Sequence, residues 1–280
     1  MGELFVVPTP IGNMSDVSPR IRETLGRVDF IACEDTRVAG RLLKILGLKK
    51  PLVSYHEHNK NKKGRLILSR LAGGESAALV TDAGTPAISD PGMVLVRMCH
   101  EGNIRVIPIA GPSAAAVAVS SSGIDCARFC FEGFLPEKRS ELKARLDEYR
   151  RETRAMVFFS PPHDLPRVLE ELFSALGDRQ ASLCKELTKL NEKITYSTLG
   201  SLLQTAKETE NIKGEYVLVV AGGEKTISAN DREGLTAAEH VNYYLDMGLS
   251  KMDAIKAAAS DRGVKKSEVY GEINAKNNKR

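Results

Sequence analysis

The stretch that most constrains the fold runs from Ala77 to Gly92 and reads AALVTDAGTPAISDPG. Its first four residues are apolar and are typical of a short buried strand. A turn of small and polar residues follows, and Asp90-Pro91 then predicts a helix start, with Asp90 as N-cap and Pro91 at the first helical position. Open α/β sheets bind ligands at loops of this kind, at the carboxyl ends of their strands. The same glycines and prolines also fit a loop that only makes turns.

The rest of the N-terminal half repeats this order of strand, small or polar loop, and helix. We expect the other strands at Leu4–Val7, Asp29–Cys33, Pro51–Tyr55 and Ile104–Ile109. Strands that alternate with helices predict a largely parallel α/β sheet. The loops at the carboxyl ends then share one edge, where they can line a cleft. These loops are Pro8–Asn13, Glu34–Arg37, His56–Asn59, Asp82–Ser89 and Gly111–Ser113.

A second α/β block is expected from about Arg128 onward, because strand-like and helical segments alternate again. It opens with an extended entry segment at Phe129–Phe134. Its expected strands are Met156–Phe159, Gln180–Cys184 and Tyr216–Val220, and its expected helices are Lys138–Arg151 and Leu165–Leu176. The polar segment Glu224–Gly234 indicates a linker. We therefore divide the chain into an N-terminal α/β domain (1–115), a second α/β domain (116–224), a linker (225–233) and a small helical module (234–280).

The C-terminal module is predicted to contain three helices and carries the positive charge of the chain. The helices are expected at Ala237–Met247, from a Ser250 cap to Ala259, and from Ser267 onward, a pattern similar to helix-turn-helix. From Lys251 to Arg280 there are eight basic and four acidic residues, so this segment accounts for the whole net charge of +4. Such a segment indicates contact with a polyanion, or simply a solvated terminus.

Several classes of protein are excluded by what the sequence lacks. It has neither G-x-G-x-x-G after the first strand nor G-x-x-x-x-G-K-[ST], so a nucleoside is a more plausible ligand than a polyphosphate. It has no apolar run of about 20 residues and no signal peptide pattern, so we expect a cytoplasmic protein without a membrane span. Its five cysteines have no zinc-binding spacing and indicate reduced thiols without a metal site. The cysteines are Cys33, Cys99, Cys126, Cys130 and Cys184.

Seven short motifs in order carry a resemblance to a known family. They are VPTPIGN (7–13), EDTR (34–37), HEHN (56–59), DAGTPAISDPG (82–92), GPSA (111–114), EGFLP (132–136) and KELTK (185–189). Together they resemble the ribosomal RNA small-subunit methyltransferase I family of cytidine-2′-O-methyltransferases, within the tetrapyrrole methylase superfamily. The resemblance covers residues 4 to about 223, and Gly263–Tyr270 is similar to the terminal helical module of that family.

This resemblance implies two α/β domains with S-adenosylmethionine in the cleft between them, a homodimer, and small-subunit ribosomal RNA as the partner. The implied reaction is 2′-O-methylation of a cytidine in the decoding region. One departure concerns FFSPPHD (158–164), where the family usually has FYESPHR, so the roles of the missing Glu and Arg are in doubt at Ser160 and Asp164. The residues implied to bind the cofactor are Pro10, Ile11, Gly12, Asp82, Gly84, Thr85, Ile88, Ser113, Ala114, Phe159 and Ser160.

Methyl transfer to a ribose hydroxyl requires the donor and the oxygen to be held about 3–3.5 Å apart and in line. The hydroxyl must also lose its proton, and Asp35 and His56 are the candidates to accept it because both follow predicted strands. Arg37 is the candidate to contact phosphate or position the nucleotide. The alternative is that Glu34–Arg37 forms a helix cap with an internal ion pair and that His56 and His58 are surface residues, an interpretation that we favour for His58.

Two other functions stay open from the sequence. A tetrapyrrole C-methyltransferase keeps the fold and changes the substrate, although the basic module and the EDTR and HEHN motifs favour RNA. A nucleotide-sensing regulator that binds RNA or DNA without catalysis would use the helical module as its reader.

Overall fold

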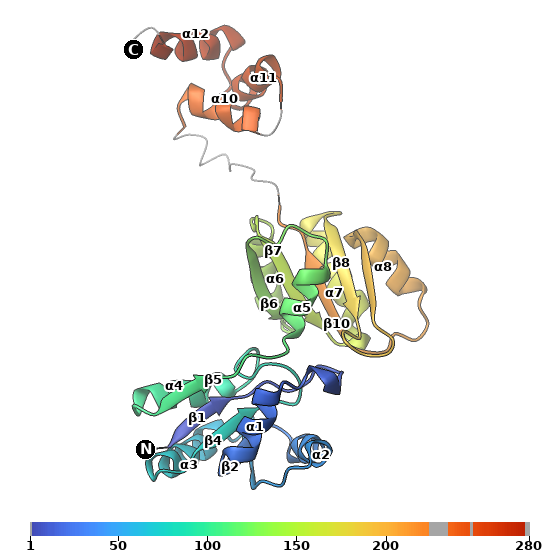
Figure 1. Ribbon diagram of the computed structural model, residues 1–280. Helices are drawn as coiled ribbons and strands as arrows, with labels where there is room; N and C mark the ends of the chain where they lie inside the picture. The colour runs from blue at the N-terminus through green and yellow to red at the C-terminus, as the bar shows by residue number, and fades with distance from the viewer. Residues whose placement is uncertain (1, 224–234, 247–248, 278–280) are drawn as a thin grey trace. The chain divides into compact units, whose positions relative to one another are not determined.

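The computed structural model describes residues 2–223, 235–246 and 249–277 (Figure 1). The chain divides into two compact units, Met1–Gly223 and Glu224–Arg280. The first unit contains two five-stranded sheets. The predicted linker, residues 225–233, lies outside the described residues, as does the predicted end of the first C-terminal helix at Met247 and Gly248.

The first sheet is parallel throughout, as the alternation of strands and helices predicted. Its strand order is β3-β2-β4-β1-β5. The central strands β2 and β4 are buried at every position, because helices cover both faces of the sheet. The strands are β1 (Glu3–Val6), β2 (Phe30–Cys33), β3 (Leu52–Ser54), β4 (Ala77–Val80) and β5 (Arg105–Pro108).

Two pairs of helices enclose this sheet (Figure 1). Helices α1 (Pro19–Arg27) and α2 (Thr36–Leu46) pack on one face around Phe5, Leu25 and Ile31. Helices α3 (Lys60–Ala72) and α4 (Gly92–Glu101) pack on the other face. A short 3-10 turn, η1 (Met14–Asp16), precedes α1.

Carboxylates stand at the starts of two helices of the first sheet, and one predicted cap was wrong by one residue. Asp35 is the N-cap of α2, because its carboxylate accepts the backbone N–H of Arg37 at 2.7 Å. Pro91, not Asp90, is the N-cap of α4. Asp90 lies one residue earlier, where its carboxylate accepts the backbone N–H of Gly92 at 2.7 Å and that of Ala87 at 2.9 Å. The Asp90 carboxylate therefore stabilises both the preceding loop and the start of the helix.

The second sheet is mixed, with the order β6-β7-β10-β8-β9. Only β6 and β7 pair in parallel, and the other neighbours are antiparallel. The edge strand β9 and the helix that follows it, α8, were not predicted. Strand β9 reads KITYST and is largely exposed, so it lacks the apolar run of the other strands. The strands are β6 (Phe129–Phe134), β7 (Ala155–Ser160), β8 (Gln180–Lys185), β9 (Lys193–Thr198) and β10 (Tyr216–Val220).

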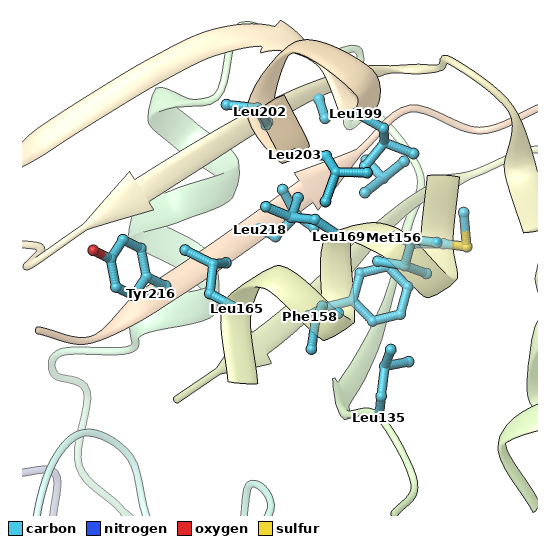
Figure 2. Packing of buried hydrophobic residues seen from close by; sticks show 14 of the residues in the cluster. Leu135, Met156, Phe158, Leu165, Leu169, Leu199, Leu202, Leu203, Tyr216 and Leu218 are labelled. Carbon is cyan, nitrogen blue, oxygen red and sulfur yellow. The ribbon is translucent and has the colours of Figure 1, made fainter. Parts of the chain in front are cut away.

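Helices cover both faces of the second sheet as well. Helix α5 (Ala114–Ser121) packs against one face through Ala115 and Ala118. The other face packs against α6 (Arg139–Tyr149), α7 (Leu165–Leu176) and α8 (Leu199–Glu208). Figure 2 shows Phe158 and Leu218 of the sheet facing the leucines of these helices. The turn η2 (Pro162–Asp164) connects β7 to α7.

The described part of the C-terminal unit consists of α10 (Ala237–Asp246), α11 (Lys251–Asp261) and α12 (Lys266–Asn277). Their small core contains Val241, Ile255 and Val269. As predicted, Ser250 caps α11, and its hydroxyl accepts the backbone N–H of Asp253 at 3.3 Å. Within the described ranges, no helix is long and apolar enough to span a membrane.

Candidate functional site

A cavity of about 410 Å³ lies in the first unit and is lined by residues of both sheets. Its size is that of a small-molecule site. The loops after β1, β4 and β5 contribute Ile11, Ala83, Gly84, Thr85, Ile88, Ser113 and Ala114. The second sheet and its loops contribute Phe134, Phe159, Ser160, Pro161, Pro162, Leu187, Glu215, Tyr216 and Val217.

Hydrogen bonds join the three loops of the first sheet. The backbone N–H groups of Thr9 and Gly84 each donate to the other residue's carbonyl, at 2.9 and 3.1 Å. The Thr85 hydroxyl donates to the carbonyl of Pro112 at 2.7 Å. Gly84 has a φ of +83°, and a Cβ there would lie 3.4 Å from the Ile11 side chain. The small residues of the loop therefore let the β1 and β4 loops meet at one wall of the cavity.

The KELTK segment (185–189) contributes to the opposite side. A Cβ on Gly12 would lie 2.3 Å from Cγ of Lys189, so the absence of a side chain lets Lys189 cross the first loop. The Lys189 ammonium donates to Glu186 at 2.8 Å and to Glu215 at 3.0 Å. These ion pairs hold the segment that places Leu187 in the cavity wall.

Most of the residues that the resemblance implied for the cofactor line this cavity. Among the implied residues, Pro10, Gly12 and Asp82 are not part of the lining. Gly12 packs against Lys189, and the Asp82 carboxylate accepts the backbone N–H of Asp35 at 3.2 Å. Which of these residues bind the cofactor stays a prediction. The residues that line the cavity as predicted are Ile11, Gly84, Thr85, Ile88, Ser113, Ala114, Phe159 and Ser160.

Sequence reasoning missed the other half of the lining. Phe134 and Leu187 lie inside the EGFLP and KELTK motifs, so a signal for them was present. Glu215, Tyr216 and Val217 lie at the start of a β-branched strand and carry no loop signature. The full set of missed residues is Ala83, Phe134, Pro161, Pro162, Leu187, Glu215, Tyr216 and Val217.

The two departures from the family pattern have different surroundings. Ser160 is buried in the cavity wall, and its hydroxyl donates to the carbonyl of Pro161 at 3.1 Å. Asp164 is not part of the lining and pairs with Arg167 at 2.6 Å at the start of α7. The Arg167 guanidinium holds the pKa of Asp164 below its ordinary value.

Three carboxylates lie near the carboxyl ends of β2 and β4. The Thr81 hydroxyl donates to Glu34 at 3.3 Å, and burial together with the neighbouring charge of Asp82 raises the pKa of Glu34. Burial also raises the pKa of Asp82. Hydrogen bonds from Arg37 have the opposite effect on Asp35 and lower its pKa to about 2. Asp35 is therefore ionised at neutral pH.

Asp35, Arg37 and His56 do not line the cavity. Asp35 is both the N-cap of α2 and the ion-pair partner of Arg37, whose Nε donates to it at 3.0 Å. Nε2 of His56 lies 3.0 Å from Nδ2 of Asn59, whose Oδ1 accepts the His56 backbone N–H. These contacts match the alternative of a cap with an internal ion pair, and the catalytic roles stay predictions. His58 is exposed, as expected.

Replacing Arg37 by alanine is expected to raise the pKa of Asp35 from about 2 toward its ordinary value of 3.8. The change should be about 1 pH unit, because the backbone N–H bonds remain. Since the folded pKa lies below the unfolded one, the pair stabilises the fold above about pH 4, and this stabilisation is lost as the pH falls through about 2. Carboxyl ¹³C NMR titration measures this pKa. Arg154→Ala is the matched control, because it should raise the pKa of Glu152 from about 2 and leave Asp35 unchanged.

In the part of the chain that the structure describes, no group of three His, Cys, Asp or Glu side chains is placed to hold a metal ion. The cysteines are free thiols. Burial raises the pKa of Cys33 to about 12 and that of Cys99 to about 11, so both stay protonated at neutral pH.

The fold and the cavity can now be compared with known proteins. Residues 3–203 match the family model of the tetrapyrrole (corrin/porphyrin) methylases, so the chain is an α/β enzyme of the methyltransferase class. Solved structures agree on the fold: diphthine synthase has a TM-score of 0.60 at 15% identity, covering 79% of this chain and 90% of that one. Uroporphyrin-III C-methyltransferase from Thermus thermophilus has a TM-score of 0.57 at 15% identity, covering 79% and 94%.

Sequence identity with curated relatives indicates which family within this class the chain belongs to. Ribosomal RNA small subunit methyltransferase I from Bacillus subtilis is 41% identical over 96% of this chain and 93% of its own length. The protein of that name from Escherichia coli O157:H7 is 42% identical over the same shares. The chain therefore belongs to the ribosomal RNA small subunit methyltransferase I family, within the tetrapyrrole methylases. The resemblance drawn from the seven motifs is confirmed.

The chemistry of the cavity fits S-adenosylmethionine, the cofactor of this class. The walls are mostly apolar, as an adenine ring and a methionine side chain require, and include Ile11, Leu187 and Val217. Ser113 and Glu215 are polar residues of the lining, and the Glu215 carboxylate is paired with Lys189. When bound, S-adenosylmethionine supplies a methyl group on a positively charged sulfur.

Proposed function

We propose that this chain methylates the 2′-hydroxyl of a cytidine in the decoding region of small-subunit ribosomal RNA. The observation that carries the proposal is the identity of about 40% with curated small-subunit rRNA methyltransferases over nearly the whole chain. A cavity with the chemistry of the cofactor supports it. The enzyme would act in the cytoplasm, on free RNA or on a ribosomal subunit. We also propose that it is a homodimer, and analytical ultracentrifugation tests this oligomeric state.

The proton of the ribose hydroxyl has two candidate acceptors. A carboxylate with a pKa of about 2 is a weak base at neutral pH, so the ion pair makes Asp35 the poorer candidate. Nδ2 of Asn59 donates to Nε2 of His56 and Nδ1 is buried without a partner, so His56 can act as the base only if the Asn59 contact opens. The Arg37 side chain is 83% exposed, so it can reach a phosphate group while it remains paired with Asp35.

Basic side chains on two elements support an RNA substrate. From His58 to Gly74 there are five basic residues and no acidic one. Lys60 pairs with Glu57 and Arg70 with Glu75, whereas the described residues show no ion pair for Lys62, Lys63 or Arg65. The C-terminal module adds the exposed residues Lys251, Lys256, Lys265 and Lys266. Helix α3 follows the HEHN loop (56–59), so its charges begin at the carboxyl edge of the first sheet.

The double variant Lys62→Glu, Arg65→Glu is expected to weaken RNA binding at least about 10-fold at physiological salt. The slope of log affinity against log salt should also fall by about 1 to 2, because phosphate contacts are lost. Filter binding to deproteinised small-subunit RNA over a salt series measures both. Arg139→Glu, Lys143→Glu makes the same charge change on exposed positions of α6 and should leave the slope nearly unchanged. Equal losses in both variants would show a general effect of net charge.

The proposed function is tested with labelled S-adenosylmethionine, purified protein and small ribosomal subunits from a strain that lacks this gene. We expect label in 2′-O-methylcytidine after nucleoside analysis. Cofactor binding without label in RNA would contradict the proposal. A porphyrinogen that accepts the label would instead favour the tetrapyrrole methyltransferase.

A further inference from the structure

Phe134 is a large aromatic residue at the cavity that no assigned role explains, and its exposed fraction is 55%. We propose that its ring stacks on the pyrimidine base of the nucleotide that is methylated. This inference rests on the proposed function, because it assigns a binding residue for the RNA substrate of the same site.

A β-bulge places Phe134 on the cavity face of its sheet. Strand β6 pairs with β7, and the register shifts so that Phe131 lies opposite Val157 but Gly133 opposite Phe158. Glu132 is the extra residue. Side chains alternate between the two faces of a regular strand, so without the bulge Phe134, three residues after Phe131, would lie on the face of Phe158, which packs against α6 and α7. With the bulge, Phe134 lies opposite Phe159, on the cavity face.

The surroundings of the bulge fix this arrangement. Glu132 is paired with Arg145 of α6 at 2.6 Å. Gly133 has a φ of +68°, and a Cβ there would lie 3.2 Å from Oγ of Ser89, in the loop that follows β4. Leu135, the residue after Phe134, is buried in the core of the second sheet and is labelled in Figure 2. Contacts of Glu132, Gly133 and Leu135 therefore hold the bulge in place, and a bulge of this kind changes the face on which the following side chain lies.

The ring of Phe134 is held in place although it is exposed. It lies edge to face with Phe159, with the ring centroids 5.6 Å apart, and Phe159 lies edge to face with Phe131 at 5.0 Å. Phe159 and Phe131 are only partly exposed, so Phe134 is the outermost ring of this group of three. A fixed aromatic face that remains open to solvent is the surface on which unstacked bases bind in RNA-binding proteins.

The position on the cavity favours the RNA base over the cofactor. Ile11, Leu187 and Val217 are buried in the cavity wall, where a small molecule is enclosed. Phe134 and Ile88, which is 42% exposed, are the exposed large hydrophobic residues of the lining. A nucleotide of a large RNA approaches from solvent and meets these residues first. Its base must leave the RNA stack to present the ribose, and an aromatic ring compensates for the lost stacking.

The test compares Phe134→Ala, Phe134→Tyr and Phe134→Leu in the full-length protein. We expect kcat/KM for undermethylated small subunits to fall between about 5-fold and 150-fold in the alanine variant. Tyrosine should retain activity near that of the wild type, and leucine, which has no π face, should resemble alanine. Affinity for S-adenosylmethionine without RNA, measured by calorimetry, should stay within about 2-fold in all three, because stacking on the RNA base leaves the cofactor contacts unchanged.

Phe129→Ala is the matched control, because Phe129 lies on the same strand, is 43% exposed and does not line the cavity. It should have wild-type kinetics. Full activity of the leucine variant would overturn the inference by showing apolar packing instead of stacking. An equal loss of cofactor affinity would overturn it by assigning the ring to the cofactor, and an unaffected alanine variant would also overturn it. If the wild-type protein transfers no label to small-subunit RNA, the proposed function fails and this inference fails with it.

Discussion

Replacing Ala114 by tryptophan is expected to weaken binding of S-adenosylmethionine about 100-fold while the fold is retained. Ala114 is the first residue of α5 and lines the cavity. An indole at this position would occupy space that the ligand needs, and overfilling a packed site costs about 1–3 kcal/mol. At about 1.4 kcal/mol per factor of ten, the upper part of that range corresponds to about 100-fold in affinity. Calorimetric titration with S-adenosylmethionine measures the change directly.

The control for this prediction is Ala116→Trp on the same helix. Ala116 is exposed and is not part of the cavity lining, so the same increase in volume should leave cofactor affinity unchanged. Circular dichroism should show native spectra for both variants. Wild-type affinity in Ala114→Trp would mean that the cofactor binds outside this cavity, and the assignment of the cofactor site would be wrong.

Replacing Phe158 by alanine is expected to lower the free energy of unfolding by about 3–5 kcal/mol. Phe158 is 0% exposed and packs in the core of the second sheet (Figure 2). Its ring centroid lies 5.3 Å from that of Tyr149. Truncation removes apolar contacts and leaves a cavity that rigid leucines on α7 and α8 cannot fill. Urea unfolding monitored by circular dichroism gives the free energy, provided that the two units unfold separately or are fitted separately.

Phe129→Ala serves as the comparison, because the same substitution at a 43% exposed position should change stability by less than about 0.5 kcal/mol. The Phe158 prediction also concerns function. Phe159, the next residue, lines the cavity from the opposite face of the strand, so loosening of the core should displace it. A stability of Phe158→Ala near that of the wild type would show that the second sheet does not depend on this core.

The strands that carry apolar runs could be predicted, and those that do not were missed. Ala77–Val80 and Tyr216–Val220 were predicted with the bounds that the structure shows, and Phe129–Phe134, expected as an extended entry segment, is strand β6. Strand β9 could not be predicted from KITYST, because an edge strand needs no continuous apolar face. The antiparallel pairing in the second sheet was also not predicted. Pairing direction depends on long-range contacts that local patterns do not encode.

The cavity residues also divide into those with a local sequence signature, which could be predicted, and those without one, which could not. Loops with strong local signatures placed Ile11, Gly84 and Thr85 at the cavity. Glu215 and Val217 were not predicted. A residue at or next to a strand lines a cavity only if the tertiary structure places another element opposite it. Asp35 illustrates the converse. Its position after a strand suggested a base, whereas the structure shows a carboxylate engaged by the amide and guanidinium of Arg37.

By itself, the sequence determined the alternation of strands and helices in the first half, the parallel sheet that they form, and the family. These follow from the spacing of apolar residues, from helix caps and from seven motifs, all of which act over a few residues. Only the tertiary structure decided which loops meet, what the carboxylates bind and on which face Phe134 lies. The bulge at Glu132 puts Phe134 on the same face as Phe131, and it is visible only once β6 is paired with β7, because register is a property of two strands together.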